Sequence, residues 1–291
     1  MYAEPFDYAA ARSWDEAVDL LRENGEDAKV IAGGQSLIPM MTLRLAMPTF
    51  LVDVNDADRS RIERRGDRIS ISAVTRHAEL ERSPGLATDC PMLAEAASLV
   101  GNIRVRHRGT IGGSLAHADP AAELPCAAVA LGAELQTLGP GGERRIPAGE
   151  FFDSFFTTAL QPGELVTGVE VPTIPRGTGW SFVELLRRTS DFAVVAVAAL
   201  VTLDGRGVGT AAKLAAAGVG DRPEDLTHAA EALLGGSVDD RSAGEAGRRA
   251  AAAVDPSAAT HASSDYRRAM LEVMVRRAVL QAAGRARGAA G

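Results

Sequence analysis

The sequence lacks the residues needed to build a metal centre of its own. Only two of its 291 residues are cysteines, Cys90 and Cys126, whereas an iron–sulfur cluster usually needs four thiolates. None of the five histidines pairs with another at metal-ligand spacing, and neither an H-E-x-x-H nor a C-x-x-C motif occurs. We therefore expect no protein-held metal. We expect the two cysteines to be buried free thiols in a reducing cytoplasm, with a disulfide between them as the alternative.

Long apolar runs and an excess of positive charge are also missing. The longest apolar run, residues 192–201, has about half of the roughly 18 residues that a membrane span requires. The N-terminus shows neither the basic nor the apolar region of a signal peptide. The formal net charge is -7, whereas a nucleic-acid partner would require a basic stripe. The sequence therefore predicts a cytoplasmic protein with no membrane span and no nucleic-acid partner.

Glycine, by contrast, is clustered in two short segments, and one of them is typical of a ligand-binding loop. The stretch from Gly109 to Pro125 contains the sequence Gly109-Thr-Ile-Gly-Gly-Ser114. Glycine can turn through positive φ and lie close to a ligand, and successive N–H groups in such a turn form a nest that holds an anion. The hydroxyls of Thr110 and Ser114 would add donors. The pattern favours a diphosphate-binding loop, and the alternative is a tight structural turn.

A second glycine segment strengthens this hypothesis. Residues 29–32 are predicted to form a buried strand, which leads directly into Gly33-Gly-Gln-Ser36. Two such segments, far apart in the sequence, could close on one diphosphate from two sides. Neither is a dinucleotide-binding fingerprint of the G-x-G-x-x-G type, and no P-loop or nucleophile-elbow motif is present.

The remaining pattern mixes strands and helices without a regular βαβ alternation, which predicts an α+β fold. At 291 residues the chain is long enough for one large domain or two of ordinary size, and the proline- and glycine-rich segment 172–179 predicts a boundary. Strands are expected at 51–54, 69–72, 134–138, 165–171, 180–186, 194–203 and 208–217. Helices are expected at 13–24, 75–82, 91–100, from 121 onward, and at 224–234, 242–254 and 266–283.

The two glycine segments carry a family resemblance. Ala32-Gly-Gly-Gln-Ser36 and Thr110-Ile-Gly-Gly-Ser114 resemble the paired FAD-pyrophosphate loops of the flavoprotein subunit of molybdenum hydroxylases. The medium subunit of aerobic carbon monoxide dehydrogenase is the nearer branch of that family, and the FAD subunit of xanthine dehydrogenase is the more distant one. Further similar blocks cover nearly the whole chain: residues 41–48, 51–55, 104–109, 162–172, 187–193 and 266–268.

The resemblance implies a fold and a cofactor. Residues 1–175 would form a two-lobed FAD-binding domain of the vanillyl-alcohol-oxidase/PCMH type. Residues 180–288 would form a smaller carbon monoxide dehydrogenase flavoprotein C-terminal domain, with a three-stranded antiparallel sheet and a helical bundle. No catalytic residue is assigned, because the flavin would supply the redox chemistry.

The resemblance also implies which residues bind FAD. Those of the two glycine segments are Ala32, Gly33, Gly34, Gln35, Ser36, Thr110, Ile111, Gly112, Gly113 and Ser114. Glu123 would hydrogen-bond FAD, or serve simply as a helix-start charge. Leu165 would lie at the flavin ring, or be a strand core residue. Phe192 would stack near the ring, where many relatives have Tyr.

Several neighbouring positions remain open. His117 would contact the flavin or make a structural hydrogen bond. The four phenylalanines between 151 and 156 would fill the core, or wall the flavin. In some relatives a lysine before the Phe192 segment contacts the flavin, and residues 182–185 contain none.

The implied function is that of an FAD-carrying electron-transfer subunit. Its partners would be a molybdopterin-binding large subunit and a [2Fe–2S] small subunit, assembled as a dimer of heterotrimers. Electrons would pass from the clusters through FAD to a quinone, oxygen or NAD. One alternative is a stand-alone FAD-dependent oxidoreductase acting directly on a small molecule. Another is a module that keeps the fold and binds no FAD.

Overall fold

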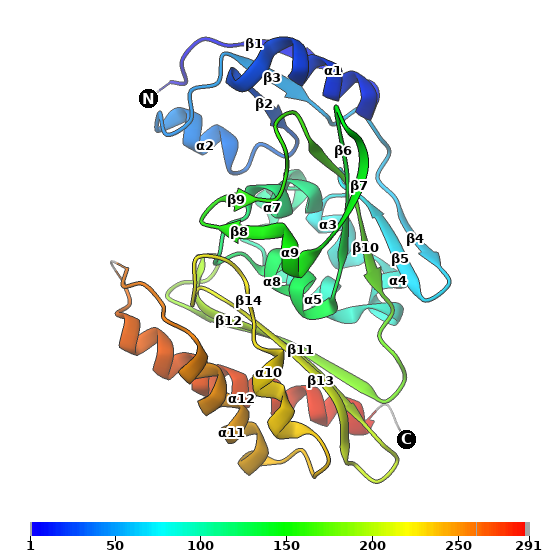
Figure 1. Ribbon diagram of the computed structural model, residues 1–291, viewed down its shortest axis with the longest axis vertical. Coiled ribbons are helices and arrows are strands. Elements are labelled where there is room, and N and C mark those ends of the chain that lie inside the picture. Colours follow the sequence, from blue (N-terminus) through cyan, green and yellow to red (C-terminus); the bar gives the residue numbers. More distant parts are fainter. Residues whose placement is uncertain (1, 260, 289–291) are drawn as a thin grey trace.

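The N-terminal lobe is a small parallel sheet covered by one helix. The computed structural model describes residues 2–259 and 261–288, and this lobe lies at the top of Figure 1. Its strands are β1 (Asp7–Ala10), β2 (Ala28–Ile31) and β3 (Phe50–Asp53), with β3 in the centre. Helix α1 (Trp14–Asn24) starts where Ser13 accepts a hydrogen bond from the Glu16 amide, and it ends at Gly25. Parallel neighbours place the carboxyl ends of β2 and β3 at one edge.

The second lobe is built on a five-stranded antiparallel sheet. Its strand order is β4 (Ile62–Arg65), β5 (Arg68–Ser72), β10 (Leu165–Pro172), β6 (Glu134–Gly139) and β7 (Gly142–Pro147). A two-stranded ribbon, β8 (Phe152–Ser154) and β9 (Thr157–Thr158), lies beside it. The helices of this lobe are α3 (His77–Arg82), α4 (Pro84–Asp89), α5 (Pro91–Leu99), α6 (Ile103–Arg108), α7 (Ile111–His117), α8 (Glu123–Leu131) and α9 (Ala148–Phe151).

The C-terminal part is a sheet backed by helices, at the bottom of Figure 1. Its strands are β11 (Thr178–Leu186), β12 (Ala193–Leu203), β13 (Gly209–Ala217) and β14 (Glu224–Asp225), all antiparallel. Its helices are α10 (Thr227–Ala230), α11 (Asp240–Ala253) and α12 (Ser264–Gly288), with a short 3-10 turn, η2 (Glu231–Leu233). The expected three-stranded sheet is therefore extended by a short fourth strand.

The predicted helix at 224–234 is wrong in its first residues. Glu224 and Asp225 pair with β13 as β14. The Asp225 carboxylate then accepts a hydrogen bond from the Thr227 amide at 2.8 Å, so a helix starts only at Thr227. The other expected strands and helices, and the α+β class, are confirmed to within a few residues at their ends.

The sheet β11–β13 separates two cores. One face of β12, including Ala196 and Ala198, belongs to the core shared with α5 and α8, and the other, including Val195 and Val197, belongs to the core shared with α11 and α12. This alternation is the period of two expected for a strand buried on both faces. The seam between the second lobe and the C-terminal part is thus a packed interface. Within the described ranges, no helix combines the length and the apolar character needed to cross a bilayer.

Candidate cofactor site

The two glycine segments meet at Gly33. A Cβ atom on Gly33 would lie 2.7 Å from the Gly109 Cα and against the Arg108 carbonyl oxygen. Only glycine permits such a close approach of two backbones. The prediction that these distant segments come together in space is confirmed, and we call their meeting point, Gly33–Ser36 with Gly109–Ser114, the junction.

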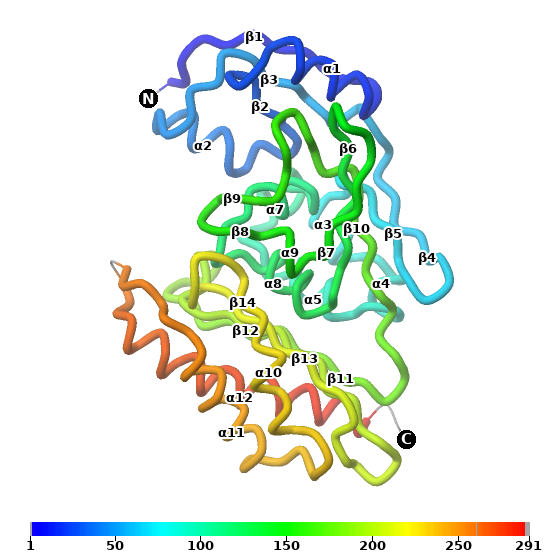
Figure 2. Tube along the Cα trace, viewed as in Figure 1, coloured from blue at the N-terminus to red at the C-terminus, as the bar shows by residue number. Residues whose placement is uncertain are grey.

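The first segment of the junction is an open loop. It links β2 to α2 (Leu37–Thr42), which lies above α7 in the view of Figure 2. Gly34 has a φ of 70°, which favours glycine. Across the part of the chain that the structure describes, the backbone N–H groups of Gly34, Gln35 and Ser36 have no hydrogen-bond acceptor. Three successive free N–H groups form the donor set that an anion requires.

The second segment is a helix start, and the expectation of a positive-φ nest there is wrong. Gly109, Gly112 and Gly113 all have negative φ. The Ile111 amide donates to the Thr75 carbonyl at 3.0 Å, and the Gly112 amide donates to the Ala73 carbonyl at 2.9 Å. The amides are therefore satisfied by residues 73–75, a segment that sequence spacing could not connect to this one.

The cap of α7 uses the remaining backbone donors of this segment. Thr110 Oγ1 accepts a hydrogen bond from the Gly113 amide at 3.1 Å, and the Ser114 amide donates to the Thr110 carbonyl at 3.0 Å. A Cβ on Gly112 would lie 2.5 Å from the Ala73 Cβ, so this glycine serves packing. A Cβ on Gly113 would meet only Thr110 Oγ1, so this glycine borders open space. Ser114, half-buried, offers its hydroxyl as a ligand donor.

Two polar side chains brace the junction from behind. Asn55, at the carboxyl end of β3, donates from Nδ2 to the Ala32 carbonyl at 2.9 Å. Arg76 donates to Asn55 Oδ1 at 2.6 Å and to the Arg108 carbonyl. This chain of hydrogen bonds joins the first segment to the second. The sequence reasoning missed both roles, although the block 51–55 marked the end of a strand.

His77 fixes the second segment more directly. Its backbone N–H donates to the Gly109 carbonyl at 3.0 Å, and its Nε2 lies 2.9 Å from the Thr110 carbonyl and 3.3 Å from Ser114 Oγ. A carbonyl only accepts, so Nε2 carries the proton. The ring therefore does not take the Ser114 hydroxyl hydrogen, which remains free for a ligand.

Burial keeps this histidine neutral. Burial, assisted by the charges of Arg76 and Arg106, lowers the pKa of His77 to about 4, against an opposing effect of its hydrogen bond to Thr110. The His77 Nδ1 atom is buried and has no hydrogen-bond partner among the described residues. A protonated ring would put an unpaired charge in the core, so the second segment is held in place by a neutral imidazole.

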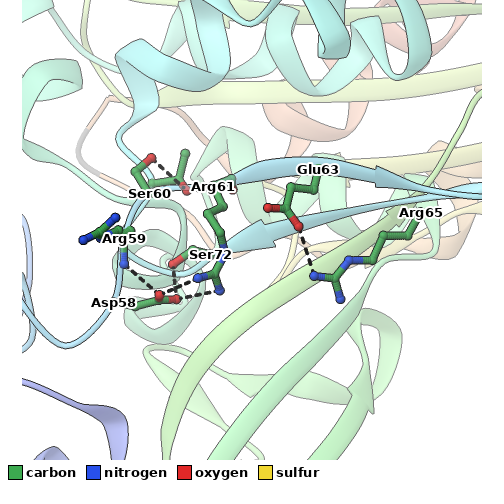
Figure 3. Close-up of polar contacts among 8 residues, drawn as sticks. Asp58, Arg59, Ser60, Arg61, Glu63, Arg65 and Ser72 are labelled. Carbon is green, nitrogen blue, oxygen red and sulfur yellow. Dashed lines mark hydrogen bonds and ion pairs between the residues drawn. The ribbon is translucent and has the colours of Figure 1, made fainter.

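A cavity of about 510 Å³ lies beside the braces. Asn55, Arg76, Asp58, Arg82 and His107 are among the residues that line it. The Asp58 carboxylate is already engaged: it accepts hydrogen bonds from both Arg61 terminal nitrogens, at 2.8 and 3.1 Å, and from the Ser72 hydroxyl at 2.9 Å (Figure 3). The Asp58 carboxylate in this wall is thus neutralised, and the Glu79 carboxylate accepts a hydrogen bond from the Arg76 amide at 2.8 Å.

The other end of α7 leads to the seam between the second lobe and the C-terminal part. With seven residues, α7 spans about 10 Å. Asp119 then accepts a hydrogen bond from the Ala121 amide at 2.9 Å, and Glu123 begins α8. The interpretation of Asp119 as a turn acid is confirmed. Glu123 is 7% exposed, and burial raises its pKa to about 7, with a smaller contribution from Asp119.

The aromatic side chains near this end divide into two groups. Phe151 and Phe152 are buried in the core, whereas Phe155 and Phe156 are exposed. The Phe156 ring centroid lies 5.0 Å from that of His117. The expectation of a single role for residues 151–156 is therefore wrong, because the β8–β9 turn carries its last two phenylalanines outward.

The two remaining candidates lie at different depths. Leu165 is 4% exposed and packs in the core of the N-terminal lobe, so its position fits the strand-core interpretation. Phe192 is 63% exposed at the start of β12. The Gly218 amide donates to the Pro120 carbonyl at 2.8 Å, which ties the end of β13 to the turn before α8. The contacts of Leu165 and Phe192 with a flavin stay predictions.

Cys90 and Cys126 are buried free thiols, as expected. Across residues 2–259 and 261–288, no group of three or more His, Cys, Asp or Glu side chains is placed to hold a metal ion.

Comparison with known proteins gives concordant matches along the chain. The model described as the FAD binding domain in molybdopterin dehydrogenase matches residues 4–174, and the CO dehydrogenase flavoprotein C-terminal domain matches residues 180–282. The chain is 40% identical to the 6-hydroxypseudooxynicotine dehydrogenase complex subunit alpha of Paenarthrobacter nicotinovorans, over 97% of this chain and 96% of that one. It is 36% identical to the carbon monoxide dehydrogenase medium chain of Afipia carboxidovorans, over 97% and 98%. A solved structure of carbon monoxide dehydrogenase from Hydrogenophaga pseudoflava superposes with a TM-score of 0.95 at 37% identity, covering 98% of this chain and 99% of that one.

Proposed function

Because this chain belongs to the family of FAD-binding medium subunits of molybdenum hydroxylases, we propose that it carries electrons from [2Fe–2S] clusters of a partner subunit through its FAD to an external acceptor. The chain is a flavoprotein component of an oxidoreductase, and FAD is its cofactor. When bound, a flavin supplies hydride and one-electron chemistry, and the protein supplies binding, orientation and electrostatics.

The observation that carries this proposal is the junction. Its residues fit a diphosphate, because three adjacent backbone N–H groups have no acceptor among the residues that the structure describes, and neither segment contains an acidic side chain. Gly34, Gln35 and Ser36 would hold the phosphates through their amides. Ser114 would donate its hydroxyl from the opposite side, and Thr110 would position it through the cap of α7.

The seam would receive the flavin end of the cofactor. Helix α7 spans about 10 Å from the junction toward the seam, where the turn at Asp119 leads to Glu123. Glu123 would hydrogen-bond the cofactor as a buried acid, and Phe192 would lie against the ring with its exposed face. We propose residues 1–175 as the FAD-binding domain and residues 180–288 as the C-terminal domain that closes this end.

The proposal includes partners that this chain does not contain. They are a molybdopterin-binding large subunit and a [2Fe–2S] small subunit, in a dimer of heterotrimers located in the cytoplasm. The free state of Cys90 and Cys126 supports a reducing compartment. Leu43, Leu45 and Met47 are each more than 60% exposed on one segment of the N-terminal lobe, which supports an assembly that covers this surface.

The substrate site would reside in the large subunit. Two of the similar proteins bear names that refer to 6-hydroxypseudooxynicotine and to carbon monoxide, which are chemically unrelated. Similar flavin subunits that work with different large subunits explain why the names of these relatives refer to unrelated substrates.

The test is anaerobic reduction of the purified chain, alone and with its two partner subunits. The isolated chain should carry releasable FAD that dithionite bleaches, and should not be bleached by carbon monoxide or by N-heterocyclic substrates. With both partners present, the correct substrate should bleach the flavin absorbance. Rapid bleaching of the isolated chain by a substrate would contradict the subunit role and favour a stand-alone oxidoreductase, and a colourless chain would contradict FAD binding.

A further inference from the structure

Two glutamates, one buried and one half-buried, lie near each other at the seam between the second lobe and the C-terminal part. Glu123 is the first residue of α8, and Glu184 lies in β11 opposite Ala196 of β12. Phe182, two residues earlier on β11, packs in the core shared with α8, whereas Val183 packs in the core of the helical bundle. Because side chains alternate along a strand, Glu184 lies on the face turned toward α8.

Neither carboxyl group is matched by a cation. Within the described part of the chain, no ion pair involves Glu123 or Glu184, and the Glu184 Oε1 atom is buried without a hydrogen-bond partner. Glu123 is 7% exposed and accepts no hydrogen bond from another described residue. A buried carboxylate without a partner is costly, so both groups favour the neutral acid.

The surroundings of Glu123 and Glu184 favour the protonated form of both carboxyl groups. Burial raises the pKa of Glu184 to about 8, and the charge of Glu123 raises it further in the same direction. Glu123, whose pKa is raised to about 7, ionises first, and its charge then opposes ionisation of Glu184. Asp119 also raises the pKa of Glu123, and burial and the charges of both glutamates raise the pKa of the Cys126 thiol.

The cations on the elements packed around the pair are engaged elsewhere: on α12, Arg267 donates to the Val194 and Gly218 carbonyl groups. The cross-strand neighbour of Glu184 is an alanine. On α5, which also packs against β11, Glu95 is already paired with Arg285 at 2.6 Å. A buried carboxyl oxygen without a hydrogen-bond partner is a group that a bound ligand can satisfy.

We propose that Glu184 binds the flavin ring as a neutral acid, donating a hydrogen bond from its half-buried carboxyl group to a carbonyl oxygen or ring nitrogen. This inference rests on the proposed function, because it takes the flavin to occupy the seam. The binding-competent form of the chain is the one in which Glu184 carries its proton. FAD affinity is therefore coupled to pH, and it falls about ten-fold per pH unit once Glu184 ionises.

The test is the dissociation constant of FAD from pH 5.5 to 9, measured by fluorescence on chain freed of its flavin. The wild-type constant should be flat to about pH 7 and should weaken steeply above pH 8. Glu184→Gln, neutral and still a donor, should keep the low-pH affinity across the whole range. Glu184→Met, similar in volume without a donor, should bind at least ten-fold more weakly at pH 6. Glu123→Gln should move the onset of weakening to lower pH.

Matched controls keep the outcomes separate. Glu26→Gln, at an exposed position in the turn after α1, should leave the curve unchanged. The melting temperature of flavin-free Glu184→Gln, relative to wild type, should increase between pH 5 and pH 8 and then level off, which verifies the buried acid without FAD. Wild-type pH dependence in Glu184→Gln, or unchanged affinity in Glu184→Met, would overturn the role of Glu184. A wild-type chain that binds no FAD at any pH would instead contradict the proposed function.

Discussion

The two glycine segments have almost the same sequence pattern and opposite structures. In Ala32-Gly-Gly-Gln-Ser36 the chain is an open loop with a positive φ at Gly34 and three free amides. In Thr110-Ile-Gly-Gly-Ser114 it is a capped helix start whose amides are already paired. The first segment therefore presents its backbone to a ligand, and the second presents side-chain hydroxyls.

The difference has a physical origin outside both segments. Residues 73–77 lie against the second segment and supply the Ala73 and Thr75 carbonyls and the His77 ring. At the first segment, Asn55 donates to the Ala32 carbonyl and so leaves the amides of residues 34–36 untouched. A glycine pattern thus marks a close approach of backbone, and its neighbours decide whether the approach is to a ligand or to protein.

The largest effect should come from separating the two segments. Gly33→Val would force side-chain atoms against Arg108 and Gly109, and overpacking of this kind costs about 3 kcal/mol, or more than a hundred-fold in binding. We expect loss of nearly all bound FAD, measured by flavin absorbance of the purified chain. Gly205→Val is the matched control, because a Cβ at Gly205 meets nothing within 4 Å. Full FAD content in Gly33→Val would show that the contact between segments is dispensable.

Acid should loosen the second segment and spare the first. The pKa of His77 is lowered from 6.5 to about 4, so the unfolded state binds the extra proton. Stability is fully present above pH 6.5 and is lost as pH falls toward 4, by about 3 kcal/mol. Urea unfolding of His77→Gln should lack this contribution. The exposed His107→Gln should unfold like wild type, and an unaltered pH profile in His77→Gln would contradict the neutral imidazole.

The third-largest effect should be a difference in stability between alanine variants of the two segments, caused by backbone strain. Gly34→Ala puts a Cβ at a φ of 70°, at a cost of about 1–2 kcal/mol. Gly113→Ala disturbs the Thr110 cap but gains helix propensity, and these effects of about 1 kcal/mol oppose each other. Unfolding of the flavin-free chain should therefore show a clear loss for Gly34→Ala and little change for Gly113→Ala. Equal losses would mean that the two glycines serve the same conformation.

The smallest effect should come from one hydroxyl. Ser114→Ala removes a donor worth about 1 kcal/mol, so FAD should bind roughly five-fold more weakly with little change in stability. Ser98→Ala is the control, because the Ser98 hydroxyl bonds within its own helix at 2.7 Å. Titration calorimetry with FAD measures both. Identical affinities would place the diphosphate on the first segment alone.

Local signals in the sequence predicted most of the fold. Ser13 capped a helix, Gly25 ended it, alternation at 69–72 marked a real strand, and so did the apolar segment at 194–203 before a tight turn. The failures were long-range: β14 formed because Glu224 and Asp225 pair with β13. For the site, the meeting of the glycine segments was predictable from their shared pattern. The roles of Asn55, Arg76, His77 and Glu184 could not be predicted, because each of these side chains acts on residues distant in the sequence.

Hydrogen exchange of the backbone amides tests the central contrast most directly. In flavin-free chain, the amides of Gly34, Gln35 and Ser36 should exchange fast, and those of Ile111, Gly112 and Gly113 should already be protected by their hydrogen bonds. Addition of FAD should protect the first set strongly and change the second set little. Strong new protection confined to residues 111–113, with residues 34–36 unchanged, would contradict the claim that the first segment binds FAD through its backbone amides.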